Sequence, residues 1–86
     1  MIDATAHVTI DHDLIKSWAE ERGGHPAVLR DPDETAVRIA FERNETAIVG
    51  WEVFFRTFEE RNLALLYQSR NRDGRLSRFC RLVTRN

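Results

Sequence analysis

Arginine is the residue type whose number and spacing most strongly suggest chemistry in this sequence. Twelve of the 13 Lys and Arg residues are arginines, and half of these fall within residues 70–85. They are Arg70, Arg72, Arg75, Arg78, Arg81 and Arg85. A guanidinium group binds pairs of phosphate or carboxylate oxygens. We therefore take these six residues as the candidate binding site.

Three interpretations of the arginine-rich segment stay open. Cations interleaved with aromatic residues, here Tyr67 and Phe79, are typical of nucleic-acid surfaces. The positive charge would equally suit an acidic protein surface, on a second copy of the chain or on another protein. The arginines would also protect the edges of a sheet from aggregation.

A group of possible metal ligands lies near the N-terminus. His7, Asp11, His12 and Asp13 are close in sequence, and imidazole and carboxylate groups suit transition metals. Helix capping by the carboxylates explains the same residues more simply. We expect no metal site and no cofactor.

The single cysteine offers the other candidate for chemistry. Arg78 and Arg81 flank Cys80, and neighbouring cations lower the pKa of a thiol. The alternative, which we favour, is a small half-buried hydrophobe. The sequence contains no nucleotide-binding glycine loop, no H-E-x-x-H and no cysteine pair. We therefore predict no catalytic residues and a non-enzymatic protein.

Charge is unevenly distributed along the chain. Residues 1–60 carry 6 basic and 13 acidic side chains, a net charge of −7, whereas residues 61–86 carry 7 arginines and Asp73, a net charge of +6. No apolar run approaches the 18 residues that a membrane span needs, and the N-terminus does not resemble a signal peptide. One cysteine cannot form an internal disulfide, which favours a reducing compartment. We expect a cytoplasmic protein that binds no membrane.

The element that must organise the fold is a helix containing Trp51–Phe58. Trp51, Phe54, Phe55 and Phe58 fall at i, i+3, i+4 and i+7, so a helix places all four on one face. Gly50 is a weak N-cap, and Asn62 stands where a left-handed residue ends a helix.

A second helix is predicted from about His12 to Arg22, with Asp11 as its N-cap and Gly23-Gly24 as its end. Its predicted buried face consists of Leu14, Ile15, Trp18 and Ala19.

Alternation and turn residues predict two hairpins. The first pairs Ala27–Arg30 with Thr35–Phe41 through a turn at residues 31–34. The second pairs Leu63–Gln68 with Leu76–Thr84 through a turn ending in Asp73-Gly74. Leu63–Gln68 is apolar on both faces, which predicts an interior strand.

The predicted fold class is therefore α+β, as one domain over residues 1–86. The element order is α-β-β-α-β-β, with an antiparallel sheet of about four strands and both helices on one face. Residues 1–9 are expected to be a loose or partly extended arm.

The two halves of the chain resemble each other at an offset of 39 residues. Ala19-Glu20-Glu21-Arg22 corresponds to Phe58-Glu59-Glu60-Arg61, Ile15 to Phe54, and Gly23 to Asn62. A tandem duplication would give a pseudo-twofold fold. Chance similarity in a chain rich in Arg and Glu is the alternative.

The segment from His12-Asp13 through Trp18-Ala19-Glu20-Glu21-Arg22-Gly23-Gly24 to Pro26 resembles a family of small bacterial proteins of unknown function. Trp51-Glu52-x-Phe54-Phe55, Leu63-Ala64-x-Leu66-Tyr67-Gln68 and Phe79-x-x-Leu82-Val83 are similar to its second half. The resemblance covers about residues 9–83 and implies no activity, although some similar sequences carry the label of 1,4-α-glucan branching enzyme. Gly50 departs from the family pattern, where a serine-type cap is usual.

These observations predict a protein-interaction or self-association module. Nucleic-acid binding through the arginine-rich hairpin is one alternative. An accessory role in glucan metabolism, suggested only by the resemblance, is the other.

Overall fold

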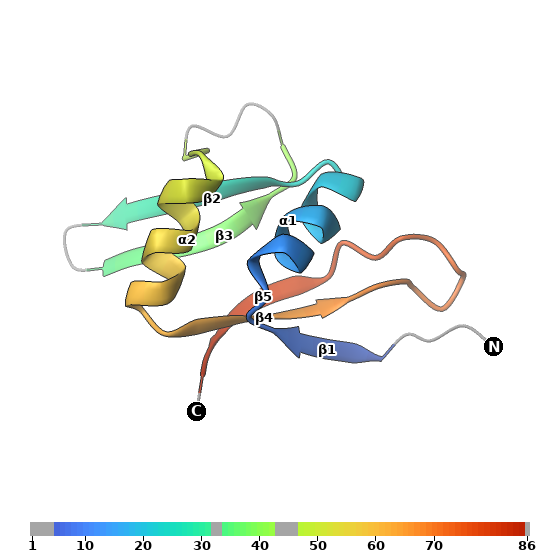
Figure 1. The fold of residues 1–86 in the computed structure, drawn as a ribbon. Helices are drawn as coiled ribbons and strands as arrows, with labels where there is room; N and C mark the ends of the chain where they lie inside the picture. Colours follow the sequence, from blue (N-terminus) through green and yellow to red (C-terminus); the bar gives the residue numbers. More distant parts are fainter. Residues whose placement is uncertain (1–4, 32–33, 43–46, 86) are drawn as a thin grey trace.

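The computed structural model describes residues 5–31, 34–42 and 47–85, and it confirms the α+β fold class. Two helices lie on one side of two antiparallel sheets (Figure 1). The elements are β1 (Ala6–Thr9), α1 (His12–Glu21), β2 (His25–Asp31), β3 (Glu34–Ala40), α2 (Trp51–Glu60), β4 (Leu63–Gln68) and β5 (Cys80–Thr84). Neither helix is long and apolar enough to cross a membrane.

The N-terminal arm, predicted to be loose or partly extended, is a paired strand over residues 6–9. Residues 6–9 form β1, which pairs with β4 so that Val8 lies opposite Leu66. β4 is thus the central strand of the sheet β1-β4-β5, as its two apolar faces predict. Pairing fixes β1 because β4 would otherwise present an unpaired edge next to the core.

The strands also divide into two sheets, where the sequence predicts one. β2 pairs only with β3, and β3 lies beside β5 without pairing to it in the described residues. Alternation along a strand shows which residues face the core, but it contains no information about which edges meet. The second strand of the second hairpin is shorter than the predicted Leu76–Thr84. β5 begins only at Cys80, and a single bridge joins Arg70 to Leu76.

The strand order is symmetric about the line between β3 and β5. Residues 47–49 run along the outer edge of β2, where Ile48 bridges Ala27 and the Val28 N–H donates to the Ala47 carbonyl at 2.9 Å. The full order is therefore 47–49, β2, β3, β5, β4, β1. β1, which precedes α1, pairs with β4 of the second half of the chain. Residues 47–49, which precede α2, lie along β2 of the first half. The duplication of the two halves stays a prediction.

The predicted helix ends are confirmed. The Asp11 carboxylate accepts hydrogen bonds from the backbone N–H groups of Asp13 and Leu14. Gly23 and Asn62, 39 residues apart, both adopt left-handed backbone angles, with φ of 72° and 55°. Gly50 precedes α2 without a side-chain cap, as its lack of a side chain dictates.

The aromatic face of α2 is central to the core, but only half of it is fully buried. Phe54 and Phe58 are completely enclosed, whereas Trp51 and Phe55 are half-buried and stack on each other with ring centroids 5.4 Å apart. The residues around the enclosed pair come from both sheets and from α1: Ile15, Trp18, Ala19, Val28, Val37, Ile39 and Leu65. Leu14, predicted to be buried, is 37% exposed because α1 turns only Ile15, Trp18 and Ala19 inward.

Of the predicted turns, the one at residues 71–74 is confirmed. Gly74 has φ of 88°, and the Asn71 N–H donates to the Arg75 carbonyl at 2.8 Å. The centre of the turn at residues 31–34, and residues 43–46 of the predicted connection, lie outside the described residues.

Gly24 lies where the end of α1 and β3 leave no room for a side chain. A Cβ atom there would lie 2.7 Å from Ile39 Cγ2 and 3.2 Å from the Ala19 carbonyl oxygen. We expect Gly24→Ala to lower the free energy of unfolding by about 1–3 kcal/mol through overpacking. Urea unfolding measures the change.

Gly50→Ser is the matched control, because nothing lies within 4 Å of a Cβ at Gly50 and its backbone is extended. Serine would supply the missing cap and raise the free energy of unfolding by a few tenths of a kcal/mol. Equal unfolding midpoints for Gly24→Ala and the wild type would contradict the packing described.

Candidate interaction surface

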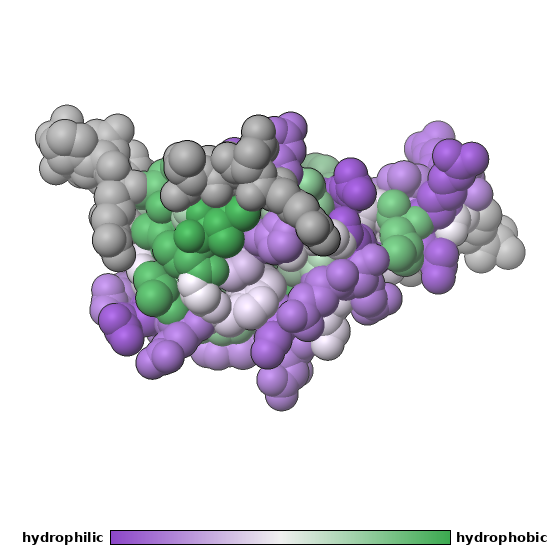
Figure 2. All heavy atoms as spheres, turned by 90° about the horizontal axis from the view of Figure 1, so that it is seen from above, coloured by the Kyte–Doolittle hydropathy of each residue, from purple (hydrophilic) through white to green (hydrophobic). Residues whose placement is uncertain are grey.

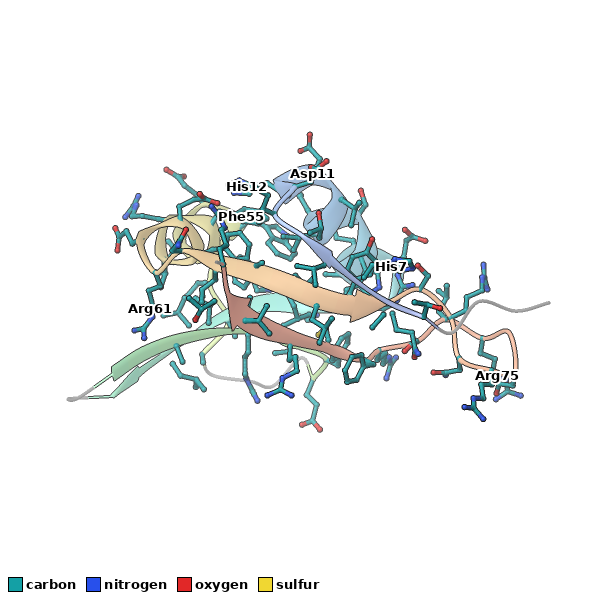
Figure 3. All side chains as sticks on the ribbon, turned by 90° about the horizontal axis from the view of Figure 1, so that it is seen from below. His7, Asp11, His12, Phe55, Arg61 and Arg75 are labelled. Atoms are coloured by element: carbon teal, nitrogen blue, oxygen red, sulfur yellow. The ribbon has the colours of Figure 1, made fainter. Side chains whose placement is uncertain are left out.

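The six arginines predicted as a binding site are distributed over three places in the structure. Three belong to the hairpin tip, where the Arg70 guanidinium donates to the Gly74 carbonyl at 2.8 Å and Arg75 lies 3.9 Å from Asp73. Arg72 is exposed beside them. Figure 3 shows Arg75 at the far end of the hairpin, away from both helices.

Arg78 and Arg81 lie closer to the sheets. The Arg78 guanidinium lies over the Phe41 ring, 5.5 Å from its centroid. Arg81 is exposed and lies opposite Leu66 in the register of β4 and β5.

Arg85 has a structural position. Its guanidinium donates to Glu59 Oε2 at 2.6 Å and to the Leu63 carbonyl at 2.5 Å, and it lies 5.3 Å from the centroid of the Phe58 ring. These contacts attach the end of β5 to α2. We therefore remove Arg85 from the candidate binding residues.

The possible metal ligands near the N-terminus make separate contacts in the fold. Asp11 caps α1, and His12 stacks on Phe55 with ring centroids 4.0 Å apart while its Nε2 lies 2.8 Å from Glu59 Oε2. His7 lies against Tyr67 on β4. Among the described residues no group of three or more His, Cys, Asp or Glu side chains could hold a metal ion.

His12, Glu59 and Arg85 form one cluster that joins α1, α2 and the end of β5. The hydrogen bond from Arg85, and to a smaller extent the one from His12, lowers the pKa of the Glu59 carboxyl. Because both partners donate to one carboxylate oxygen, the cluster fixes the relative position of three elements that are distant in sequence.

Arg22 is a buried residue whose role the sequence analysis missed. Its guanidinium donates to the carbonyl oxygens of Ser77 at 2.6 Å, Ser69 at 2.7 Å and Trp18 at 2.8 Å, and it lies 4.5 Å from the centroid of the Trp18 ring. Burial lowers the pKa of this guanidinium. The signal was present in the spacing, because Arg22 follows Ile15 by seven residues and so continues the buried face of α1.

Cys80 is not an activated thiol. Burial raises its pKa to about 11, and the opposing charge of Arg22 does not overcome this effect. The predicted half-buried position of Cys80 is confirmed, and the flanking Arg78 and Arg81 are not among the groups that shift the pKa of the thiol.

The side of the sheets opposite the helices carries exposed apolar residues. Leu65 and Leu82 pack toward the helices, so Val8, Leu66 and Arg81, which form one row across β1, β4 and β5, point the other way. Val8 is 62% exposed.

Phe79 and Leu29 extend this surface at its two ends. The Gln68 N–H donates to the Phe79 carbonyl, which places Phe79 in the same alternation as Arg81, and Phe79 is 48% exposed. On β2 the Val28 side chain points into the core, so the side chain of the next residue, Leu29, points away from the helices. Leu29 is 43% exposed. In Figure 3 the helices lie above the strands, and no described helix covers the side below. We call Val8, Leu29, Leu66 and Phe79 the open face.

A groove of about 610 Å³ lies between β3 and β5. Its apolar lining includes Val37, Ile39, Leu63 and Leu82, and its basic lining consists of Arg38, Arg61 and Arg81. Figure 3 shows Arg61 pointing down from the end of α2 toward the strands.

The electrostatic charge differs between the two sides of the molecule. The two helices carry six acidic and two basic side chains, three and one on each. The open face and the groove carry Arg38 and Arg81, and the adjacent hairpin carries the arginines of its tip. Figure 2, seen from above the view of Figure 1, shows a hydrophobic patch bordered by hydrophilic side chains.

The lowered pKa of Glu59 makes stability depend on pH. Since the folded pKa lies below the ordinary value of 4.5, the carboxylate contributes stability above that value and loses it as the pH falls through the folded pKa. We expect the wild type to lose stability more steeply than Glu59→Gln in this acid range. Urea unfolding at several pH values measures the slopes. Glu60→Gln, on the exposed neighbour, is the control, and equal slopes for Glu59→Gln and the wild type would be inconsistent with the cluster.

Replacing Arg22 tests how the long hairpin is attached to α1. Lysine keeps the charge but cannot reach three carbonyl groups in a planar geometry, so Arg22→Lys should cost about 2–4 kcal/mol of unfolding free energy. Hydrogen exchange should accelerate in residues 69–77. The exposed Arg56→Lys is the control and should change stability by less than about 0.5 kcal/mol. Unchanged exchange in residues 69–77 would show that the hairpin is held in another way.

Searches with family models, among curated proteins and among solved structures return no match to this chain. The resemblance of residues 9–83 to a family of small bacterial proteins therefore stays a prediction. The residues that carry it have structural roles here: Trp18 and Arg22 hold the hairpin, Gly23 ends α1, and Gly24 allows β3 to pack closely.

Proposed function

We propose that this chain is a protein-interaction domain that binds an acidic partner through the open face. The observation that carries this proposal is the exposure of large apolar side chains on the side of the sheets that no described helix covers. Large apolar side chains that stay exposed on one side of a protein, among charged residues, favour an interaction site there.

The arginines around the open face determine the kind of partner. Arg81 lies within the apolar row and Arg38 lies in the same alternation on β3. Buried between two proteins, the exposed Arg81 would be stabilised by a carboxylate opposite it. A partner that presents acidic residues around an apolar centre meets both requirements.

Self-association is the variant of this proposal that the charge distribution favours. The acidic helices of one copy would meet the arginines of the next. Such a contact is heterologous, so it would build rings or open chains in place of a closed dimer.

The decisive variant is Phe79→Ser, which removes the largest exposed apolar side chain of the open face. We expect chemical crosslinking in lysate to capture an acidic partner with the wild type and to lose at least about tenfold of it with Phe79→Ser. Leu76→Ser is the matched control, because Leu76 is 39% exposed but lies on the α1 side of the hairpin. Light scattering across concentrations detects self-association. A strict monomer whose captured proteins are the same for both variants would refute the proposal.

Nucleic-acid binding is the second candidate, and the exposed hairpin tip favours it. Arg72 and Arg75 project from the molecule where phosphate groups could reach them. An electrophoretic shift with single- and double-stranded DNA and RNA at low salt tests it, with Arg72→Gln and Arg75→Gln expected to weaken any binding and its salt dependence. The absence of a shift at micromolar protein would reject this candidate.

A further inference from the structure

A hollow of about 310 Å³ lies between α1 and the long hairpin. Leu14 lines it from α1 and Leu76 from the hairpin, and these residues are 37% and 39% exposed. The half-buried Tyr67 lines it from β4. The volume is at the lower end of the range for ligand sites. Large apolar side chains that border a hollow and stay exposed favour a binding site for an apolar group.

Arg22 brings a buried positive charge to the same hollow. The residue is 7% exposed, and its guanidinium donates three hydrogen bonds, all to neutral carbonyl groups. A guanidinium has five N–H groups. The other two N–H groups of Arg22 have no partner among the described residues. A buried cation whose protein partners are all uncharged would be stabilised by an anion.

Arg70 and Glu21 complete the charge of the hollow. Burial lowers the pKa of Arg22 most, and Glu21 and Arg70 are both close enough to shift it as well. Arg70 donates one hydrogen bond, to the Gly74 carbonyl, and so keeps N–H groups for a ligand. The lining therefore contains two positive side chains and one negative one, a net charge of +1. One carboxylate neutralises this charge, whereas a dianion would leave an excess of negative charge beside Glu21.

The two walls of the hollow are held in place before any ligand binds. The Arg22 guanidinium joins the Trp18 carbonyl of α1 to the Ser69 and Ser77 carbonyls on the two arms of the hairpin. The Trp18 indole Nε1 also donates to the Gln68 carbonyl at 3.1 Å. A rigid site loses little conformational entropy when it binds, so more of the interaction energy appears as affinity.

We propose that this hollow binds a small aromatic monocarboxylate. The carboxylate pairs with Arg70 and with the two remaining N–H groups of Arg22, because carboxylate and guanidinium groups match in charge and geometry. The ring lies between Leu14 and Leu76 and contacts Tyr67, since aromatic pairs add to the effect of apolar burial. The site goes beyond the proposed protein-interaction function, because it lies on the α1 side of the hairpin and shares no residue with the open face.

The test uses the full chain and three ligands that share one naphthalene ring system. Naphthoate carries a carboxylate, naphthamide is its neutral isostere, and naphthyl phosphate is a dianion at about pH 8. Isothermal titration calorimetry should give naphthoate a Kd below about 1 mM. The amide should bind at least about tenfold more weakly and the phosphate at least about threefold more weakly. In amide NMR spectra the shifts should concentrate in residues 14–22 and 67–76.

Two pairs of variants test the polar and the apolar contacts separately. Arg70→Gln should weaken naphthoate at least about fivefold, whereas Arg72→Gln, on an exposed arginine outside the hollow, should change its Kd less than about twofold. Leu76→Ser should weaken it at least about fivefold, and Phe79→Ser, on the open face, less than about twofold. Urea unfolding midpoints are measured for all four variants. If Leu76→Ser does not fold, Arg70→Gln decides alone.

Four results would overturn the inference: no saturable binding at about 5 mM naphthoate, equal affinity for naphthoate and naphthamide, tighter binding of the phosphate, or equal losses in the test and control variants. Its failure is distinguishable from that of the proposed function. Phe79→Ser is the test variant for the protein partner and the control for naphthoate, and Leu76→Ser has the opposite roles. Each site is therefore supported or rejected by a different variant.

Discussion

The packing of α2 against both sheets is the constraint on which the rest of the structure depends. Phe54 and Phe58 are fully enclosed, and their neighbours include Val37 from one sheet and Leu65 from the other. No strand pairing joins these sheets in the described residues, so side-chain burial replaces the hydrogen bonds that usually connect adjacent strands. Each enclosed phenylalanine contributes about 2–3 kcal/mol, which is a large share of the stability of a domain this small.

The same constraint explains why one side of the strands is not covered by any described helix. Two helices suffice to bury one side of the strands, and a chain of 86 residues has no further helix among its described residues for the other side. The arginines divide accordingly. Arg22 and Arg85 serve the interior by binding carbonyl groups, whereas Arg38 and Arg81 stay at the surface beside apolar residues.

Local rules predicted the elements well because each depends on neighbours in sequence. Asp11 caps a helix wherever it precedes one, and Asn62 and Gly23 end helices through their own backbone freedom. β4 was predicted to be interior because both its faces are apolar. The contacts of Arg22 with Ser69 and Ser77 span 47 and 55 residues, and nothing in local spacing identifies such partners. The separation of β3 from β5 was missed for the same reason.

The exchange of leading segments between the halves has a consequence for how such a chain could arise. Residues 47–49 complete the sheet of the first half, and β1 completes that of the second. A polypeptide with only one half would lack its outermost strand unless it borrowed that strand from another molecule. The duplication predicted from the sequence would therefore lead back to an intertwined homodimer of half-length chains, joined later by the fusion of two genes.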